Sequence, residues 1–423
     1  MSTAAASLRE WRAKPWFWPL VILVVAFTYP WWHDVPPFSY VTQDMLGLQL
    51  DVAVIIGVYV MLALGLNIVV GYAGLLDLGY VAFFALGAYT LGWFGSSFVK
   101  GANVHIWSSA PDGLPGIHIS VWLVLILAGM IAALAGVIIG WPTLRLRGDY
   151  LAIVTLGFGE IIPDVFRNGD AMPVPCGLQA EPPFIDFCAR NVTNGVRGIR
   201  PLDAAGFPVV SDALGFVPDR FSRLDVTWWY LGIIVLVLIT IFVISRLQDS
   251  KMGRAWIAVR EDEIAASAMG VPLMRTKLWA YAIGAIFGGI AGAYYGSFVG
   301  STDPTSFFFN ISVLILCMVI VGGMGTIWGV VLGAVVLEYI NLKGLDKIGE
   351  GLNDAISAVG IDKEVDIPKY KFLIFGVLLV TMMLLRPEGI LPSRRRQAEL
   401  HDSGDDGEPD VYDDLYDVRR EGD

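Results

Sequence analysis

Histidine and cysteine, which supply many nucleophiles and metal ligands, are scarce in this chain. Among 423 residues there are four histidines and three cysteines. No histidines stand at ligand spacing, and neither the H-E-x-x-H zinc motif nor the G-x-x-x-x-G-K-[ST] phosphate loop occurs. We therefore expect no catalytic residue, no bound metal and no cofactor on this chain.

Charge is also sparse, because only 16% of the residues are charged and 55% are hydrophobic. The mean hydropathy is +0.62, and many apolar runs can cross a bilayer core of about 30 Å. The fold class is thus an all-α polytopic membrane protein with about ten transmembrane segments, two of them short or re-entrant. The segments are 16–32, 50–70, 74–98, 119–141, 150–166, 227–245, 278–300, 309–321, 326–340 and 370–385. A single long span with a re-entrant piece over 309–340 is the alternative.

Basic residues set the expected orientation, since Lys and Arg stay on the cytoplasmic side of short loops. They precede the first span, follow the fourth and follow the last: Arg9, Arg12, Lys14, Arg145, Arg147, Arg394, Arg395 and Arg396. Ten spans place all of them on one side, so both termini are expected in the cytoplasm. The chain then divides into an N-terminal segment with an anchor span (1–49), a membrane-spanning core (50–392) and a C-terminal tail (393–423).

The net charge of −11 comes largely from the acidic tail, which has the composition of a disordered segment. No basic surface for nucleic acid is visible. Cys176 and Cys188 both fall in the predicted external region 167–226, where a disulfide and two reduced thiols are both possible. Cys317 lies in a span and is expected to be packing.

The polar loop 246–277 is longer than a simple connection needs. Asp262 is a plausible N-cap, 263–269 a short helix, Gly270 its left-handed end and Pro272 the barrier to continuation. The loop also combines a small-residue surface with a charged rim: Ala265, Ala266, Ala268 and Gly270, then Arg260, Glu261 and Asp262. A plug for another protein's groove and a solvated hairpin both fit this pattern.

Two glycine-rich breaks interrupt the apolar spans, over 67–90 and 321–333. Such glycines serve either close helix packing or unwinding beside a cavity. Asp77 favours a cavity because a carboxylate is costly at bilayer depth, although it is an ordinary helix cap if it lies at the interface. The candidate translocation residues are Asn67, Gly71, Gly74, Asp77, Gly79, Tyr80, Glu160, Gly322, Gly323 and Gly325.

Several motifs together resemble one family. They are G-L-N at 65–67, G-Y-A-G-L-L-D-L-G-Y at 71–80, R-G-D-Y-L-A at 147–152, G-R-A at 253–255, R-E-D-E-I-A-A at 260–266, G-G-M-G-T-I-W-G at 322–329 and R-P-E-G at 386–389. The chain resembles the inner-membrane permease subunits of bacterial branched-chain amino acid ABC importers, of the LivM type, over most of 50–392.

The resemblance implies that 246–277 couples the permease to a cytoplasmic ATPase. Import permeases share an E-A-A-x-x-x-G pattern there; Ala265, Ala266 and Gly270 fit it, while Ile264 occupies the acid position and Glu263 stands one residue early. The implied coupling residues are Gly253, Arg254, Arg260, Glu261, Asp262, Glu263, Ala265, Ala266 and Gly270.

The resemblance also implies the partners of the chain. These are a second permease of the LivH type, two ATP-binding subunits of the LivG and LivF types that hold ATP and Mg, and a periplasmic amino-acid-binding protein. The location would be the bacterial inner membrane, and the region 167–226 is expected to help dock the binding protein. The alternatives are a permease of the same superfamily for urea or short amides and an ion-coupled secondary carrier, which usually embeds more charged relay residues in its spans.

Overall fold

The computed structural model describes residues 17–32, 35–36, 39, 47–99, 103–111, 113–146, 148–178, 185–207, 211, 218–222, 225–358, 366–386 and 389–391. Its α-helices are α2 (Phe17–Trp32), α3 (Leu50–Asn67), α4 (Val81–Phe94), α5 (Val121–Thr143), α6 (Asp149–Arg167), α8 (Thr227–Gln248), α9 (Lys251–Glu261), α10 (Glu263–Ala268), α11 (Leu273–Val299), α12 (Phe309–Gly322), α13 (Ile327–Tyr339), α14 (Leu345–Ala358) and α15 (Lys371–Leu385). The π-helices η2 (Ile68–Tyr72) and η6 (Ile340–Gly344) continue α3 and α13. The strands are β1 (Gly95–Ser96), β2 (Asn103–Ile106), β3 (Gly116–Ile119), β4 (Met172–Leu178) and β5 (Ile185–Arg190).

Each of the ten predicted segments coincides with a helix, nine of them to within a few residues at both ends. By length and composition, seven described helices are apolar enough to span a membrane, and α4 is a shorter apolar helix. The predicted break at 322–325 is a turn between α12 and α13. The polytopic all-α prediction is confirmed.

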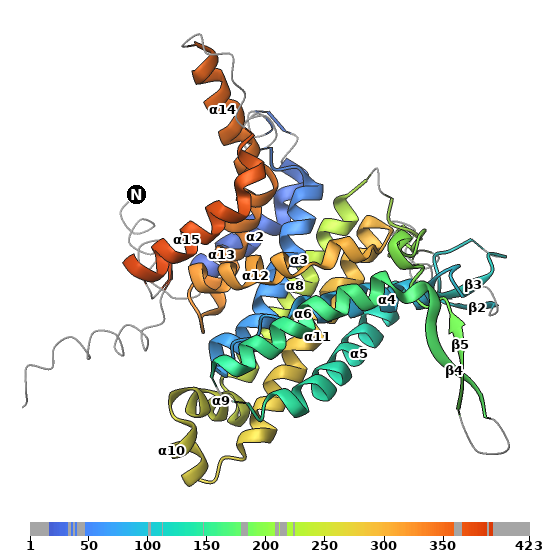
Figure 1. Cartoon of the computed structure of the whole chain (residues 1–423). Helices are drawn as coiled ribbons and strands as arrows, with labels where there is room; N and C mark the ends of the chain where they lie inside the picture. The colour runs from blue at the N-terminus through green and yellow to red at the C-terminus, as the bar shows by residue number, and fades with distance from the viewer. Residues whose placement is uncertain are drawn as a thin grey trace, which may run out of the picture.

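Two boundaries differ from the prediction. The segment 74–98 becomes helical only at Val81, because the backbone is unwound from Gly74, whose φ is +69°. The predicted connection 341–369 contains α14, which extends away from the bundle (Figure 1). Hydropathy misses α14 because its apolar residues Leu345, Ile348 and Leu352 form only a stripe along one side of a polar helix.

Helix α11 is the centre of the bundle and packs against α3, α4 and α5. Glycines make these contacts close. A Cβ on Gly87 of α4 would lie 1.9 Å from the carbonyl oxygen of Gly289, and one on Gly292 would lie 2.0 Å from that of Phe84. Small residues at helix crossings are the usual means of packing spans in lipid, where lipid is as apolar as the side chains. Of the two roles considered for the glycines, close helix packing is therefore the role of Gly87.

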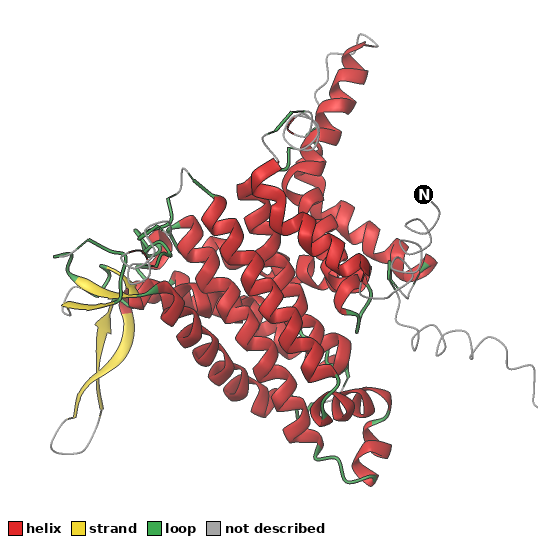
Figure 2. Cartoon of the chain, turned by 180° about the vertical axis from the view of Figure 1, so that it is seen from behind, coloured by secondary structure: helices red, strands yellow, loops and turns green. Residues whose placement is uncertain are grey.

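The two ends of the bundle differ in character. Strands β2 to β5 lie at one end, and α9 and α10 lie at the other (Figures 1 and 2). Strand β3 pairs antiparallel with β1 and parallel with β2, while β4 and β5 form an antiparallel hairpin. Cys176 and Cys188 belong to that hairpin, but their side chains lie outside the described ones, so their pairing stays open.

At the strand end, a buried hydrogen bond between His118 and Asp203 holds the three-stranded sheet to the segment that follows β5. His118 Nδ1 and Asp203 Oδ2 are 2.8 Å apart, and the carbonyl of Asp203 accepts a hydrogen bond from Ser297 Oγ of α11. The sheet is thereby attached to the central helix.

Candidate coupling site

The loop 246–277 holds two helices, where the sequence predicted one. Ser250 begins α9, because its Oγ accepts hydrogen bonds from the amides of Met252 and Gly253. The indole of Trp256 is buried and donates to the carbonyl of Thr276 on α11 at 2.9 Å. Helix α9 is therefore fixed to the central helix, and the loop is not a free hairpin.

The short helix α10 forms as its caps predict. Asp262 Oδ1 accepts hydrogen bonds from the amides of Ile264 at 2.7 Å and Ala265 at 3.1 Å. At the other end the amides of Gly270 and Val271 return to the carbonyls of Ser267 and Ala266, with Gly270 at φ +84°. This is a Schellman ending, which needs a left-handed residue where the sequence has glycine.

The outer surface of α10 is apolar. Ile264 is 73% exposed and Met269 is 86% exposed, and Ala265 between them is also exposed. Ala266, which the sequence assigned to the same surface, is buried against the chain itself. Sequence reasoning missed Ile264 and Met269 as surface residues. The available signal was that they are large apolar side chains in an otherwise polar loop, and apolar patches on exposed tips commonly mark protein interfaces.

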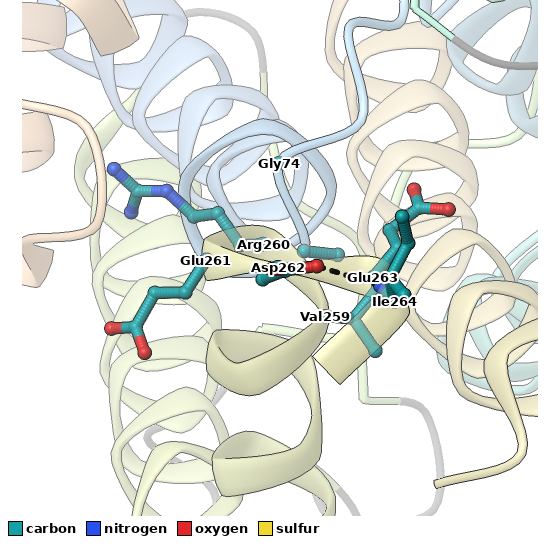
Figure 3. A pocket seen from close by; sticks show the side chains of 8 residues that line it. Gly74, Val259, Arg260, Glu261, Asp262, Glu263 and Ile264 are labelled. Atoms are coloured by element: carbon teal, nitrogen blue, oxygen red, sulfur yellow. Dashed lines mark hydrogen bonds between the residues drawn. The ribbon is translucent and has the colours of Figure 1, made fainter. Parts of the chain in front are cut away.

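Glu263 turns away from that surface. It forms an ion pair with Lys277 of α11, whose side chain is buried. In Figure 3 the carboxylates of Glu261 and Glu263 point to opposite sides. Glu263, which stands one position before the acid position of the family pattern, thus contacts its own chain and joins α10 to α11.

An open cleft of about 380 Å³ separates the loop from the end of α3 (Figure 3). Its lining residues are Ala73, Gly74, Val259, Arg260, Glu261, Asp262, Glu263 and Ile264. Arg260 was predicted to lie on the charged rim; instead its Nη1 donates a hydrogen bond of 2.5 Å to the carbonyl of Gly71. Arg254, by contrast, is exposed and donates to the carbonyl of Asp249 at 2.9 Å within its own segment.

The two glycine breaks meet beside this cleft. Asn67, fully buried, accepts from the amide of Gly325 at 2.9 Å and donates to the carbonyl of Thr326 at 3.4 Å. A Cβ on Gly71 would lie 2.6 Å from the amide nitrogen of Gly325. The structure therefore brings together Asn67, Gly71, Gly74 and Gly325, as well as Arg260 from the loop.

The second break is also contacted by the segment 389–391, which follows α15. The amides of Ile390 and Leu391 donate to the carbonyls of Val321 and Gly322. Gly323 has φ +118°, and a Cβ on Gly389 would lie 2.5 Å from its Cα. Gly389, the last residue of the R-P-E-G motif, therefore packs against the G-G-M-G segment.

Asp77 occupies the unwound stretch before α4. Asp77 is 1% exposed, and its Oδ1 accepts a hydrogen bond from the amide of Gly79 at 2.9 Å. The alternative interpretation of Asp77 as a helix cap explains the hydrogen bond of Oδ1. Nearby, Tyr80 is buried and donates from its hydroxyl to the carbonyl of Gly284 on α11 at 2.8 Å.

Glu160 lies apart from these residues, on the exposed face of α6. The opposite face of α6 contacts the first break, where Thr155 Oγ1 accepts from the amide of Leu78. Within the described part of the chain, no group of three His, Cys, Asp or Glu side chains is arranged to hold a metal ion.

Comparison with known proteins gives this arrangement a family. Residues 48–383 match the family described as the permease component of the branched-chain amino acid transport system. The chain belongs to this family. The permease is 36% identical over 358 residues to the high-affinity branched-chain amino acid transport system permease protein LivM of Escherichia coli strain K12, covering 85% of this chain and 73% of that protein.

More distant relatives extend the comparison. The probable branched-chain amino acid transport permease protein LivM of Methanocaldococcus jannaschii is 27% identical over 360 residues, covering 80% of this permease and 91% of the relative. The permease protein LivH of Escherichia coli strain K12 is 28% identical over 163 residues, which is 38% of this permease and 46% of LivH. No solved structure matches this permease. The family match makes the chain a multi-pass transport component rather than an enzyme.

Proposed function

We propose that this permease is the LivM-type subunit of an ATP-driven importer of leucine, isoleucine and valine. It forms the translocation path with a LivH-type permease, and ATP and Mg are held by two cytoplasmic ATPase subunits. The observation that carries the proposal is α10: a capped, exposed helix with an apolar tip, attached to the end of the bundle where the two glycine breaks meet.

The apolar tip has the chemistry of a docking element. A helix of six residues is too short to be stable by itself in water, yet α10 is capped at both ends and joined to α11 through Glu263 and Lys277. Side chains such as Ile264 and Met269 gain free energy when a partner's groove removes them from water. The groove is assigned to an ATPase subunit, whose movements α10 would transmit to the spans.

The orientation follows from the same loop. If α10 meets a cytoplasmic ATPase, then the strands and α14 face the periplasm, where a binding protein delivers the solute. The region 167–226, with the β4 and β5 hairpin, is our candidate for part of that docking surface. Both termini are then cytoplasmic in a bacterial inner membrane, in agreement with the basic residues near the spans.

Helix α6 is the proposed wall of the passage. Its exposed stripe carries the carboxylates of Glu160 and Asp164 among the apolar side chains of Ile153, Ile161 and Val165, and a carboxylate facing hydrocarbon is costly. The exposed stripe of α5, from Ile126 to Ile138, is apolar by contrast and suits lipid. The α6 stripe is therefore assigned to the water-filled passage and the second permease chain, which keeps Glu160 among the residues of the path.

Association with the ATPase subunits tests the docking role. Ile264→Arg is expected to abolish co-purification with the ATPase subunits, because an arginine cannot enter an apolar groove without a partner charge. Ile348→Arg is the matched control: Ile348 is also an exposed isoleucine, 57% accessible, but lies on α14 at another part of the molecule. Normal association of Ile264→Arg, or equal loss in both variants, would refute the proposed docking surface.

The solute requires its own measurement, since the binding protein would impose most of the selectivity. Uptake of labelled leucine, isoleucine and valine should exceed that of urea and acetamide. Uptake of an amide instead would transfer the assignment to that solute.

A further inference from the structure

Two polar side chains connect the end of α3 and its continuation η2 to other parts of the chain. Asn67 and Arg260, which we call the Asn67–Arg260 bridge, connect it respectively to the turn before α13 and to the coupling helix α9. The contacts join residues 258 and 189 positions apart in the sequence. The bridge therefore connects three parts of the chain that are remote in sequence.

Arg260 completes the end of the helix. The π-helix η2 ends with the amide of Ala73 bonded to Ile68 and that of Leu75 bonded to Val69. The carbonyl of Gly71 then receives no backbone donor among the described residues, and Arg260 supplies one. A cation at a helix C-terminus also complements the partial negative charge of the helix dipole. The contact is thus a specific, charge-assisted one.

The fit around Arg260 is close. A Cβ on Gly74 would lie 2.8 Å from Cγ of Arg260, and one on Gly325 would lie 3.3 Å from its Nη1. Both glycines have positive φ, +69° and +82°. The breaks therefore allow the arginine to pass between them, and a larger residue at either position would displace it.

Asn67 makes the matching contact with the second break. Its amide oxygen accepts from Gly325, and its amide nitrogen donates to Thr326, the residue that precedes α13. Only a side chain with both a donor and an acceptor at this length satisfies the two backbone groups. The turn between α12 and α13 therefore has to move with the end of α3.

From this arrangement we infer that the Asn67–Arg260 bridge makes the coupling loop, the end of α3 and the start of α13 move as one unit. Arg260 stands two residues before Asp262, the N-cap of α10. Displacement of α10 relative to α3 would lengthen the Arg260 to Gly71 hydrogen bond, and N–H···O hydrogen bonds in proteins have donor–acceptor distances of up to about 3.2 Å. The inference rests on the proposed function, since it needs α10 to be the element that an ATPase moves.

The coupling ratio tests the bridge in the assembled importer. The full complex, with its second permease, ATPase subunits and binding protein, is reconstituted in vesicles, and ATP hydrolysed and leucine taken up are measured together. Arg260→Met, which keeps the length and loses the donor, should lower leucine moved per ATP at least tenfold while the ATPase subunits remain bound. Arg260→Lys should recover part of the ratio, because an ammonium can also donate to Gly71.

Arg145→Met is the matched control, since Arg145 is an exposed arginine after α5, outside the coupling residues, and stands over the ring of Trp141 in its own segment. It should keep the wild-type ratio. Asn67→Leu should lower the ratio as Arg260→Met does, and the double variant should be no worse than the poorer single variant. If the importer with Asn67→Leu fails to assemble, Asn67→Asp replaces it in the comparison with Arg260→Met, because aspartate keeps the acceptor and loses the donor.

The outcomes separate the bridge from the docking role. A wild-type ratio in Arg260→Met, an equal loss in Arg145→Met, or additive losses in the double variant would overturn the bridge. Loss of ATPase binding in Arg260→Met would overturn it as well, because Arg260 would then belong to the docking surface. Failure of the wild-type complex to bind ATPases would instead refute the proposed function.

Discussion

Replacing Gly87 by alanine should separate α4 from the central helix. The new Cβ would lie 1.9 Å from the carbonyl oxygen of Gly289 and 2.7 Å from its Cα. An ordinary contact begins at 3.4 Å, so the two backbones have to move apart by about 1.5 Å. Because the obstacle is backbone, no side-chain rotation relieves it.

The magnitude follows from two opposing effects. Overpacking of a well-packed interior costs about 1 to 3 kcal/mol. Alanine has a higher helix propensity than glycine, by up to about 1 kcal/mol, which offsets part of that cost. Gly376→Ala is the matched control, because Gly376 lies in helix α15 with no other atom within 4 Å of its Cβ position. The Gly376→Ala variant therefore gains the higher helix propensity of alanine without a steric clash.

Unfolding of the purified permease in mixed micelles measures the difference. The free energy of unfolding of Gly87→Ala should fall about 1 to 3 kcal/mol below that of Gly376→Ala. The 14 tryptophans provide the fluorescence signal. Equal free energies of unfolding in the two variants would show that α4 and α11 do not approach as closely as described.

Three further predictions concern the polar contacts. Asp262→Ala should destabilise α10 by about 1 kcal/mol and speed hydrogen exchange at the amides of Ile264 and Ala265, whereas Asp262→Asn should keep most of the protection; equal exchange in both variants would contradict the cap. Glu263→Leu should loosen α10 more than Lys277→Met, since only the former leaves a buried unpaired charge, and exchange in the double variant should approach that of Lys277→Met. His118→Phe should leave Asp203 without its partner and speed proteolysis around residues 199–207; unchanged cleavage would contradict the attachment.

The local parts of the site could be predicted from the sequence. Asp262, Gly270 and Pro272 are signals that act within one or two turns of chain, and the structure has α10 within one residue of the predicted end. The apolar spans were predictable for the same reason, because length and hydropathy are local properties. Helix α14 was missed because hydropathy does not detect a polar helix with one apolar stripe.

The direction in which side chains point could not be predicted. Arg260 was predicted to lie on a charged rim and Glu263 to be a coupling residue, but each finds a partner on another helix, Gly71 or Lys277. Such contacts depend on how α3, α9 and α11 pack, and nothing in the local sequence specifies the packing. For the same reason the sequence marked Asn67 as a polar residue without indicating that it meets Gly325.

The position of the glycine breaks explains why the family motifs are remote in sequence. Each break ends a span early and frees backbone groups that have no water to bind within a membrane. In this permease those groups are satisfied by Asn67, by Arg260 and by the backbone of 390–391. A break that needed only flexibility would leave its partners unspecified. Here Asn67 and Arg260 come from two different motifs, and residues 390–391 directly follow a third, so the motifs are joined at the end of the bundle that carries α10.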